Sequence, residues 1–232
     1  YCTRRDGAAA GAVVSASHNP FQDNGLKFFA HDGYKLPDAV EAEIEQLALA
    51  GVPQDGRPVG AEVGQVHVRA DAAAQYAQAI RNTVPAEMRL DGVKIVLDCA
   101  HGAAALIGPD LLTAFGAQVH AIGTAPDGTN INHECGAVHT EAVQAAVRTE
   151  QAQVGIALDG DADRLILVDE RGQRVDGDMI LAMLATAAHQ RGGLPAGIVV
   201  GTVMSNMGLE VALQERGMQL PVSYTHLTLP TK

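Results

Sequence analysis

Hydrophobic positions in the middle of the chain fall into short apolar runs separated by longer mixed stretches. The apolar runs predict strands at 93–97, 118–122, 154–158 and 165–168. The stretches beside them predict helices at 104–115 and 141–150. Strands that alternate with helices form βαβ units. We therefore expect an α/β fold made of αβα sandwich domains with mixed, partly parallel sheets.

The pattern is less regular toward the N-terminus. Residues 12–16 form a short apolar run that predicts a buried strand. A helix is expected to begin at Asp38, with Glu41 three residues later in the position of a capping box. Gly51 is expected to end this helix, because glycine adopts the conformation that follows a last helical turn.

The remaining elements extend the same alternation toward the C-terminus. Helices are predicted over 71–81, 178–190 and 206–216, and a strand over 197–201. The first of these helices is expected to link two structural units. The last strand and helix begin a further βα section.

Composition and charge limit the classes of protein to consider. Hydrophobic residues make up 47% of the 232 residues and charged residues 19%, which is typical of globular proteins. Three cysteines without close pairing argue against a disulfide framework and favour a reducing cytoplasm. The chain shows neither an apolar run of about 18 residues, as a membrane span needs, nor a signal-peptide pattern at its start. A formal net charge of −11 disfavours nucleic acid as a partner, and an anionic substrate would need a positive site or a metal.

The first candidate motif is Ser-Ala-Ser-His-Asn-Pro at residues 15–20, directly after a predicted strand. A serine at a strand end in a proline-bounded turn is exposed and rigid. The neighbouring His18 and the later Lys27 are placed to tune or orient such a hydroxyl. The alternative is an ordinary turn rich in serine and asparagine, which many α/β proteins contain.

The second motif is Asp-Gly-Asp-Ala-Asp-Arg at residues 159–164. Carboxylates at alternate positions of a loop need a cation to sit together, and oxygen ligands suit Mg²⁺ or Ca²⁺. One alternative is a solvated acidic turn. Another is a calcium loop of the EF-hand type, with Glu170 at its twelfth position, but Arg164 stands where that loop needs glycine and the flanks are strand-like.

The third motif is Asp-Cys-Ala-His-Gly at residues 98–102. A loop of small residues that opens a helix can receive an anion. We favour the alternative, a structural βα loop in which His101 has a partner and Cys99 is a buried thiol.

Together these residues resemble the α-D-phosphohexomutases. Residues 15–20 resemble the phosphoserine loop of that family, and residues 159–164 resemble its metal loop, which more often has glycine where Ala162 stands. Further stretches at 19–29, 126–132 and 201–210 resemble the branch that interconverts glucosamine 6-phosphate and glucosamine 1-phosphate. The resemblance runs from about residue 10 to residue 221.

The resemblance implies an isomerase, an intramolecular phosphotransferase, with four domains around a cleft. Residues 1–72 would form the C-terminal part of its first domain and residues 73–175 its second. Residues 176–221 would begin its third domain. The sugar-reading loop, the fourth domain and an early arginine-bearing loop would lie outside this chain, so the chain alone is expected to be inactive.

By resemblance, Ser17 carries the phosphate through a bisphosphate intermediate, and His18 and Lys27 flank the phosphoryl group. The resemblance also implies a location in the cytoplasm, a role in cell-wall precursor synthesis and a phosphorylated amino sugar as substrate, with a homodimer left open. Alternatives are a phosphomannomutase or phosphoglucomutase, or a catalytically inactive metal-binding fragment.

The metal site follows from the same resemblance. Asp159, Asp161 and Asp163 would hold Mg²⁺, with an oxygen of the Ser17 phosphate as a further ligand. Arg164 would sit beside this site.

The end of the chain is expected to be non-native. Residues 222–232 do not continue the resemblance, and Val-Ser-Tyr-Thr-His-Leu matches one reading frame of a sequencing adapter. Such a segment should sit at the periphery. The alternative is a divergent natural strand, which its β-rich composition allows.

Overall fold

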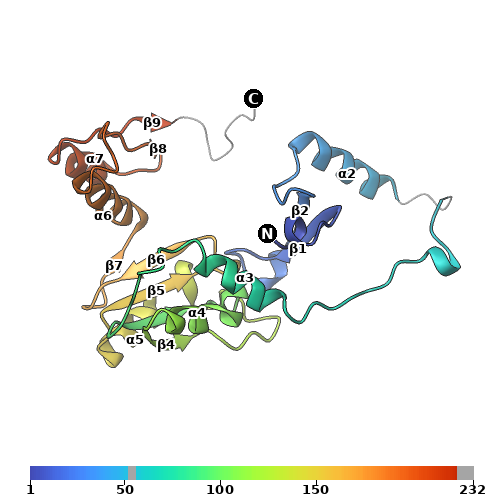
Figure 1. Cartoon of the computed structure of the whole chain (residues 1–232), viewed down its shortest axis with the longest axis horizontal. Helices are drawn as coiled ribbons and strands as arrows, with labels where there is room; N and C mark the ends of the chain where they lie inside the picture. Colours follow the sequence, from blue (N-terminus) through green and yellow to red (C-terminus); the bar gives the residue numbers. More distant parts are fainter. Residues whose placement is uncertain (52–55, 224–232) are drawn as a thin grey trace.

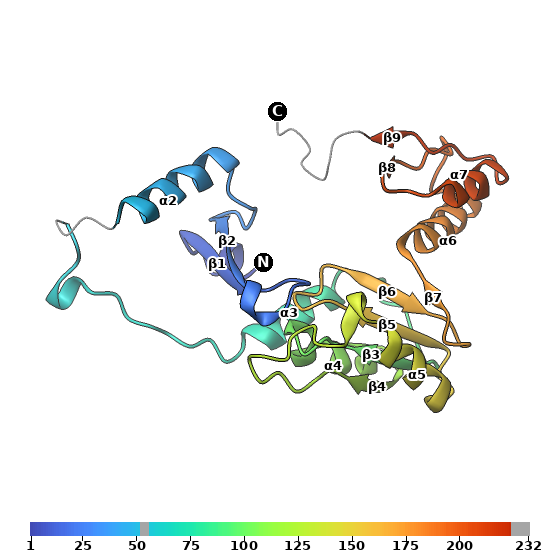
Figure 2. The same cartoon turned by 180° about the vertical axis from the view of Figure 1, so that it is seen from behind.

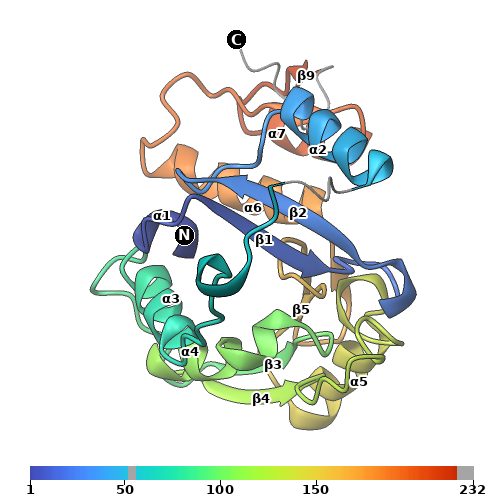
Figure 3. The same ribbon diagram turned by 90° about the vertical axis from the view of Figure 1, so that its right-hand side faces the viewer.

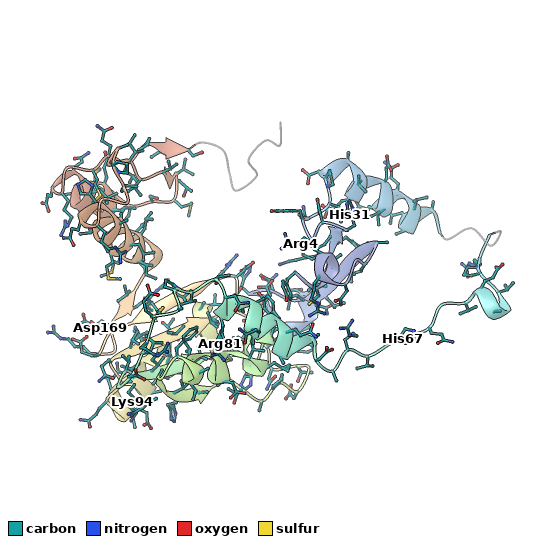
Figure 4. The ribbon with its side chains drawn as sticks, viewed as in Figure 1. Arg4, His31, His67, Arg81, Lys94 and Asp169 are labelled. Carbon is teal, nitrogen blue, oxygen red and sulfur yellow. The ribbon has the colours of Figure 1, made fainter. Side chains whose placement is uncertain are left out.

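The computed structural model describes residues 1–51 and 56–223, and these form three units along the chain (Figure 1). The first unit contains α1 (Cys2–Arg5), β1 (Ala10–Ser15), β2 (Gly25–Ala30) and α2 (Asp38–Ala50). Residues 56–71, which carry His67 and a short 3-10 helix at Gly60–Glu62, precede α3 (Ala72–Arg81) at the central unit (Figure 4). No helix within these residues is both long and apolar enough to cross a lipid bilayer.

The central unit is built on a five-stranded sheet in the order β4-β3-β5-β6-β7. Its strands are β3 (Lys94–Asp98), β4 (Gln118–Ile122), β5 (Val154–Leu158), β6 (Leu165–Val168) and β7 (Arg174–Val175). The first three are parallel to one another, while β6 and β7 are antiparallel to their neighbours. The predicted α/β class with a mixed, partly parallel sheet is confirmed.

Helices cover both faces of this sheet (Figure 2). Successive strand residues point to opposite faces. Accordingly, Val96 packs with Val143 and Val147 of α5 (Glu141–Glu150), while Leu97 packs on the other side with Leu112 of α4 (Gly108–Ala114). Complete burial of a valine side chain stabilises a fold by about 1.5–3 kcal/mol. These two cores hold the carboxyl ends of the strands in place.

The predicted elements of the central unit agree closely with the structure, apart from one helix. The bounds of β4, α5, β5 and β6 are those that the sequence predicts. The predicted helix over 104–115 is instead a short 3-10 helix, Ala103–Leu106, followed by α4. Pro109 stands at the start of α4, and a helix running through it would lose a hydrogen bond and clash with the preceding turn.

The first unit departs more from expectation. β1 pairs in antiparallel register with β2, a strand that the sequence pattern did not reveal. The predicted burial of this strand is wrong, since Val14 of β1 is 69% exposed. No residue of β1 or β2 is fully buried. Figure 3 shows the ribbon lying between α2 and the central sheet.

The ends of α2 show one correct and one incorrect prediction. Gly51 ends the helix with a φ of 81°, as expected. The capping box is wrong, because Asp38 is already helical and the cap residue, Pro37, has no side-chain hydrogen bond. Asp38 and Glu41 instead form ion pairs with Lys35, at 3.5 and 2.9 Å.

The third unit packs α6 (Gly177–Gln190) against α7 (Met207–Gln214). Each helix begins after a polar cap: Asp176 accepts a hydrogen bond from Met179 N, and Asn206 accepts one from Leu209 N. The predicted strand over 197–201 is shorter than expected. It comprises an isolated bridge at Ile198 and the strand β8 (Gly201–Thr202).

The segment predicted to be non-native begins with a short strand. β9 (Val222–Ser223) pairs in parallel with β8. The other residues of that segment, 224–232, lie outside the described residues.

Candidate functional site

The loop after β1 holds Ser17 in an unusual backbone conformation. Ser17 has a φ of 52°, in the left-handed region that residues other than glycine seldom adopt. The Ser15 hydroxyl accepts a hydrogen bond from Ser17 N at 2.9 Å, and Asn19 N donates to Ala16 O at 2.9 Å. These bonds hold Ser17, which is half-buried, at the end of the strand. The Ser15 hydroxyl is engaged with the Ser17 backbone N–H.

The acidic loop joins β5 to β6 in the central sheet. Asp159 is fully buried, and its Oδ1 accepts hydrogen bonds from Asp163 N at 3.1 Å and Arg164 N at 3.0 Å. The EF-hand alternative is wrong, because strands flank the loop and Glu170 lies beyond the far end of β6. The solvated-turn alternative is also wrong, because it would leave Asp159 in water.

The two loops are in direct contact. Gly160 N donates a hydrogen bond to Ser17 O at 3.0 Å. A Cβ atom on Gly160 would lie 2.6 Å from the same oxygen, which is too close for any side chain. Gly160 O in turn accepts from Ala103 N at 2.9 Å. Glycine is therefore required where the Ser17 loop meets the acidic loop.

The structure brings the three predicted carboxylates together. One oxygen from each of Asp159, Asp161 and Asp163 lies within 4.8 Å of the others. Asp159 Oδ2 and Asp161 Oδ1 are buried and have no hydrogen-bond partner. Unpartnered buried oxygens are costly unless a cation neutralises them. This set of hard oxygen donors fits Mg²⁺.

The electrostatics of the cluster depend on Lys27, which lies on β2. Its Nζ forms an ion pair with Asp161 Oδ2 at 2.7 Å. The hydrogen bond to Asp161 raises the pKa of Lys27, although partial burial opposes this. Burial is the largest single influence on Asp161 and opposes its ionisation, but the hydrogen bond and the charge of Lys27, with smaller contributions from Ser17 and Asp159, together lower the Asp161 pKa. Burial raises the pKa of Asp159, and the nearby Asp161 and Asp163 charges add to the effect.

The remaining predicted residues lie around this centre. His18 Nδ1 is 3.5 Å from Ser17 Oγ. Arg164 donates its backbone N–H to Asp159, and its guanidinium has no hydrogen bond or ion pair within the described part of the chain. A groove of about 850 Å³ opens beside His18, and its lining includes Phe21, His133 and His139.

Sequence reasoning missed the residue that ties the loops together. The Asn132 amide donates to Ser17 O and to Asn19 O, both at 2.8 Å. Its own φ is 57°, and asparagine tolerates that conformation better than most residues. An asparagine in a stretch rich in turn residues was the available signal, but its partners lie more than 100 positions away in the chain.

The third motif is structural, as we favoured. Asp98 is fully buried and accepts hydrogen bonds from Ala100 N at 2.9 Å and Gly136 N at 2.8 Å. The His101 ring accepts a bond from Ala125 N at 3.3 Å. Burial raises the pKa of the Cys99 thiol to about 12, so this thiol is inert at neutral pH.

Three family models match successive parts of the chain. They describe the alpha/beta/alpha domains I, II and III of phosphoglucomutase/phosphomannomutase, and they match residues 1–54, 74–172 and 176–224. The order of the matches is the order of the three units in the structure.

Curated relatives are similar over most of the chain. A protein of Geotalea daltonii named phosphoglucosamine mutase is 52% identical over 210 residues, which is 90% of this chain and 46% of that protein. One of Sorangium cellulosum with the same name is 53% identical over 207 residues, 89% of this chain and 43% of that protein. The chain thus spans about half the length of the curated relatives it matches.

Solved structures share the fold. A phosphoglucomutase/phosphomannomutase family protein of Burkholderia thailandensis is 25% identical, with a TM-score of 0.70 over 94% of this chain and 46% of that one. A putative phosphomannomutase of Thermus thermophilus is 22% identical, with a TM-score of 0.71 over 96% and 50%. Three successive domain models, relatives at about half identity and a shared fold lead to one conclusion. The chain belongs to the phosphoglucomutase/phosphomannomutase family.

Proposed function

We propose that the protein containing this chain interconverts glucosamine 6-phosphate and glucosamine 1-phosphate, with Ser17 as the phosphate carrier. The observation that carries the proposal is the contact between the Ser17 loop and the Asp159–Asp163 loop. Three clustered carboxylates would repel a phosphate on the neighbouring serine unless a cation neutralised their charge. A serine and a divalent cation side by side are suited to phosphoryl transfer.

The choice of sugar rests on the relatives. Those at 50–53% identity are named phosphoglucosamine mutase. An N-acetylphosphoglucosamine mutase of Aspergillus fumigatus, solved with GlcNAc-6P and magnesium, has the same fold at 17% identity, with a TM-score of 0.56 over 97% of this chain and 57% of that one. These names favour a phosphorylated amino sugar over glucose or mannose phosphates.

The proposed reaction consists of two transfers through Ser17. In the first, the phosphorus–oxygen bond to Ser17 Oγ breaks as a bond to a free sugar hydroxyl forms, and the hydroxyl proton ends on Ser17. The bisphosphorylated sugar then turns over. In the second transfer the bond between the other phosphoryl group and its sugar oxygen breaks as a bond to Ser17 Oγ forms, and the Ser17 proton ends on that sugar oxygen. Positioning and charge neutralisation supply most of the rate enhancement in such transfers.

Mg²⁺ is the proposed cofactor. Asp159, Asp161 and Asp163 would hold it through their unpartnered oxygens, with an oxygen of the Ser17 phosphate as a further ligand. When bound, the ion supplies positive charge that neutralises the phosphoryl group.

Three side chains around the proposed metal site have roles in the proposed reaction. Lysine is protonated at neutral pH, and the hydrogen bond to Asp161 raises the pKa of Lys27 further, so we assign it charge stabilisation rather than proton transfer. His18 lies close enough to orient the Ser17 hydroxyl. The guanidinium of Arg164 has no partner within the described residues, which leaves it available to an anionic substrate.

The test compares substrates on the full-length protein. Relative kcat/KM values on the 1-phosphates of glucosamine, glucose and mannose decide the sugar, and we expect glucosamine to be preferred. A preference for mannose or glucose would favour the phosphomannomutase or phosphoglucomutase alternative. An absence of turnover on all three would favour the catalytically inactive alternative.

A further inference from the structure

The loop between β4 and α5 reaches the Ser17 loop through the side chain of Asn132. Its amide nitrogen carries two N–H donors, and it donates to Ser17 O and to Asn19 O at 2.8 Å each. Asn132 is only 6% exposed. One buried side chain therefore binds the turn on both sides of His18.

Asn132 is itself held by the central sheet. Its backbone N–H donates to Ala100 O at 2.9 Å. The Ala100 N–H donates to Asp98, a fully buried carboxylate at the end of β3, and the second oxygen of Asp98 accepts from Gly136 N. A continuous chain of hydrogen bonds thus runs from the end of β3 to the carbonyl oxygen of Ser17.

Left-handed backbone conformations cluster along this connection. Among the described residues, the non-glycine residues with positive φ are Ser17, Ala100, His101, Asn132, Glu134, Gln151 and Ala162. All but Gln151, which ends α5, belong to the loops that contact one another around Ser17. Such conformations persist only where the surroundings impose them, so the hydrogen bonds of Asn132 help to impose the conformation of Ser17.

We propose that Asn132 is a positioning residue for phosphoryl transfer. Its amide fixes the Ser17 turn against the acidic loop and couples the first unit to the central sheet. The proposal rests on the proposed function of Ser17 and adds a residue that touches neither the sugar nor the phosphate. A residue with a merely structural role would contribute to the stability of the whole central unit without acting specifically on residues 16–20.

The experiment uses the full-length protein with Asn132→Ala and the isosteric Asn132→Asp. Asn130→Ala is the matched control, because among the described residues the Asn130 side chain bonds only Ala125 O and Asp127 N, both in its own loop. Steady-state kinetics with glucosamine 1-phosphate give kcat and KM. Amide hydrogen exchange, measured by mass spectrometry, reports the protection of the backbone amides of residues 16–20 separately from that of β3 and β5.

Both Asn132 variants should lower kcat by about 100-fold, the scale of a misplaced reacting group, with KM changed less than about threefold. Exchange at residues 16–20 should rise by about tenfold, which corresponds to the loss of about one net hydrogen bond, while β3 and β5 keep the rates of the original protein. Asn130→Ala should leave kcat and exchange at 16–20 unchanged.

Three results would overturn the proposal. The first is unchanged kcat in both variants of an active protein. The second is unchanged exchange at residues 16–20. The third is exchange that rises equally in β3 and β5, which would mark a general role in stability. If the unmodified protein has no mutase activity, the proposed function fails, and the exchange data alone decide whether Asn132 holds the Ser17 turn.

Discussion

The acidic loop extends from β5 and β6 inside a five-stranded sheet covered on both faces, whereas the Ser17 loop extends from a two-stranded ribbon with exposed valines. Two packed cores fix the position of the acidic loop. The Ser17 loop is instead held by hydrogen bonds from Gly160 and Asn132, which belong to the central unit. The comparison indicates that packing holds the proposed metal cluster, while contacts with the neighbouring loops place Ser17, the proposed phosphate carrier.

The largest loss of activity should come from breaking the contact between the Ser17 loop and the acidic loop. Gly160→Ala places a Cβ atom 2.6 Å from Ser17 O and still closer to Ile131, so the two loops must separate. Mutase kcat/KM of the full-length protein should fall by about 100-fold or more. Gly177→Ala is the control, because its Cβ meets nothing within 4 Å. A Gly160→Ala protein of normal activity would show that the contact is dispensable.

The proposed metal site at Asp159, Asp161 and Asp163 should respond strongly to Mg²⁺ at neutral pH. Cation binding should stabilise the chain by about 2.7 kcal/mol at a Mg²⁺ concentration 100 times its Kd, measured as a rise in Tm. Asp159→Asn should remove most of this rise. Asp110→Asn, which removes an exposed carboxylate of α4, should retain it. An equal rise in all three proteins would mean that Mg²⁺ acts elsewhere.

The pH dependence of the metal-free chain has a definite sign for each carboxylate. Burial raises the pKa of Asp159 above its ordinary value of 3.8. Its contribution to stability is therefore fully present below that value and lost as the pH rises through the higher folded-state pKa. The pKa of Asp161 is lowered, so its contribution is present above about pH 4 and lost as the pH falls through the lower folded-state pKa.

Replacing Asp159 with Asn should thus flatten the loss of stability on the alkaline side, as urea unfolding across pH 3–8 would reveal. A steeper loss would contradict the assignment.

The packing difference between the two regions predicts a smaller contrast in stability. Val143→Ala in α5 removes fully buried methyl groups and should cost about 2 kcal/mol. Val14→Ala in β1 removes groups that are largely exposed and should change stability by less than about 0.5 kcal/mol. Urea unfolding of the chain measures both values. Equal costs would mean that the ribbon is as well packed as the sheet.

The same comparison explains which features the sequence could reveal. The bounds of β4, α5, β5 and β6 could be predicted because apolar residues buried on both sides leave a strong pattern. The strand β2 could not, since its charged Lys27 faces the acidic loop rather than a core. The helix before Phe115 is shorter than its apolar pattern predicts, because Pro109 fixes the start of α4.

Some residues of the candidate site could be predicted from the sequence, and others could not. The Ser17 and Asp159–Asp163 loops could be found from their local residue patterns. Asn132, Gly102 and Gly160 could not be assigned, because their importance lies in contacts between distant segments. A Cβ atom on Gly102, for example, would collide with the backbone of Gly160. No local pattern of hydrophobic and polar residues records such a contact.

Phosphopeptide mapping of the full-length protein, after incubation with glucosamine 1,6-bisphosphate, tests the central claim most directly. The account predicts phosphate on Ser17, none in the Ser17→Ala variant, and slower but detectable labelling of Ser17 in Ser15→Ala, where the hydrogen bond from Ser17 N is lost. Phosphate found only on Ser15, or labelling that survives Ser17→Ala, would contradict it.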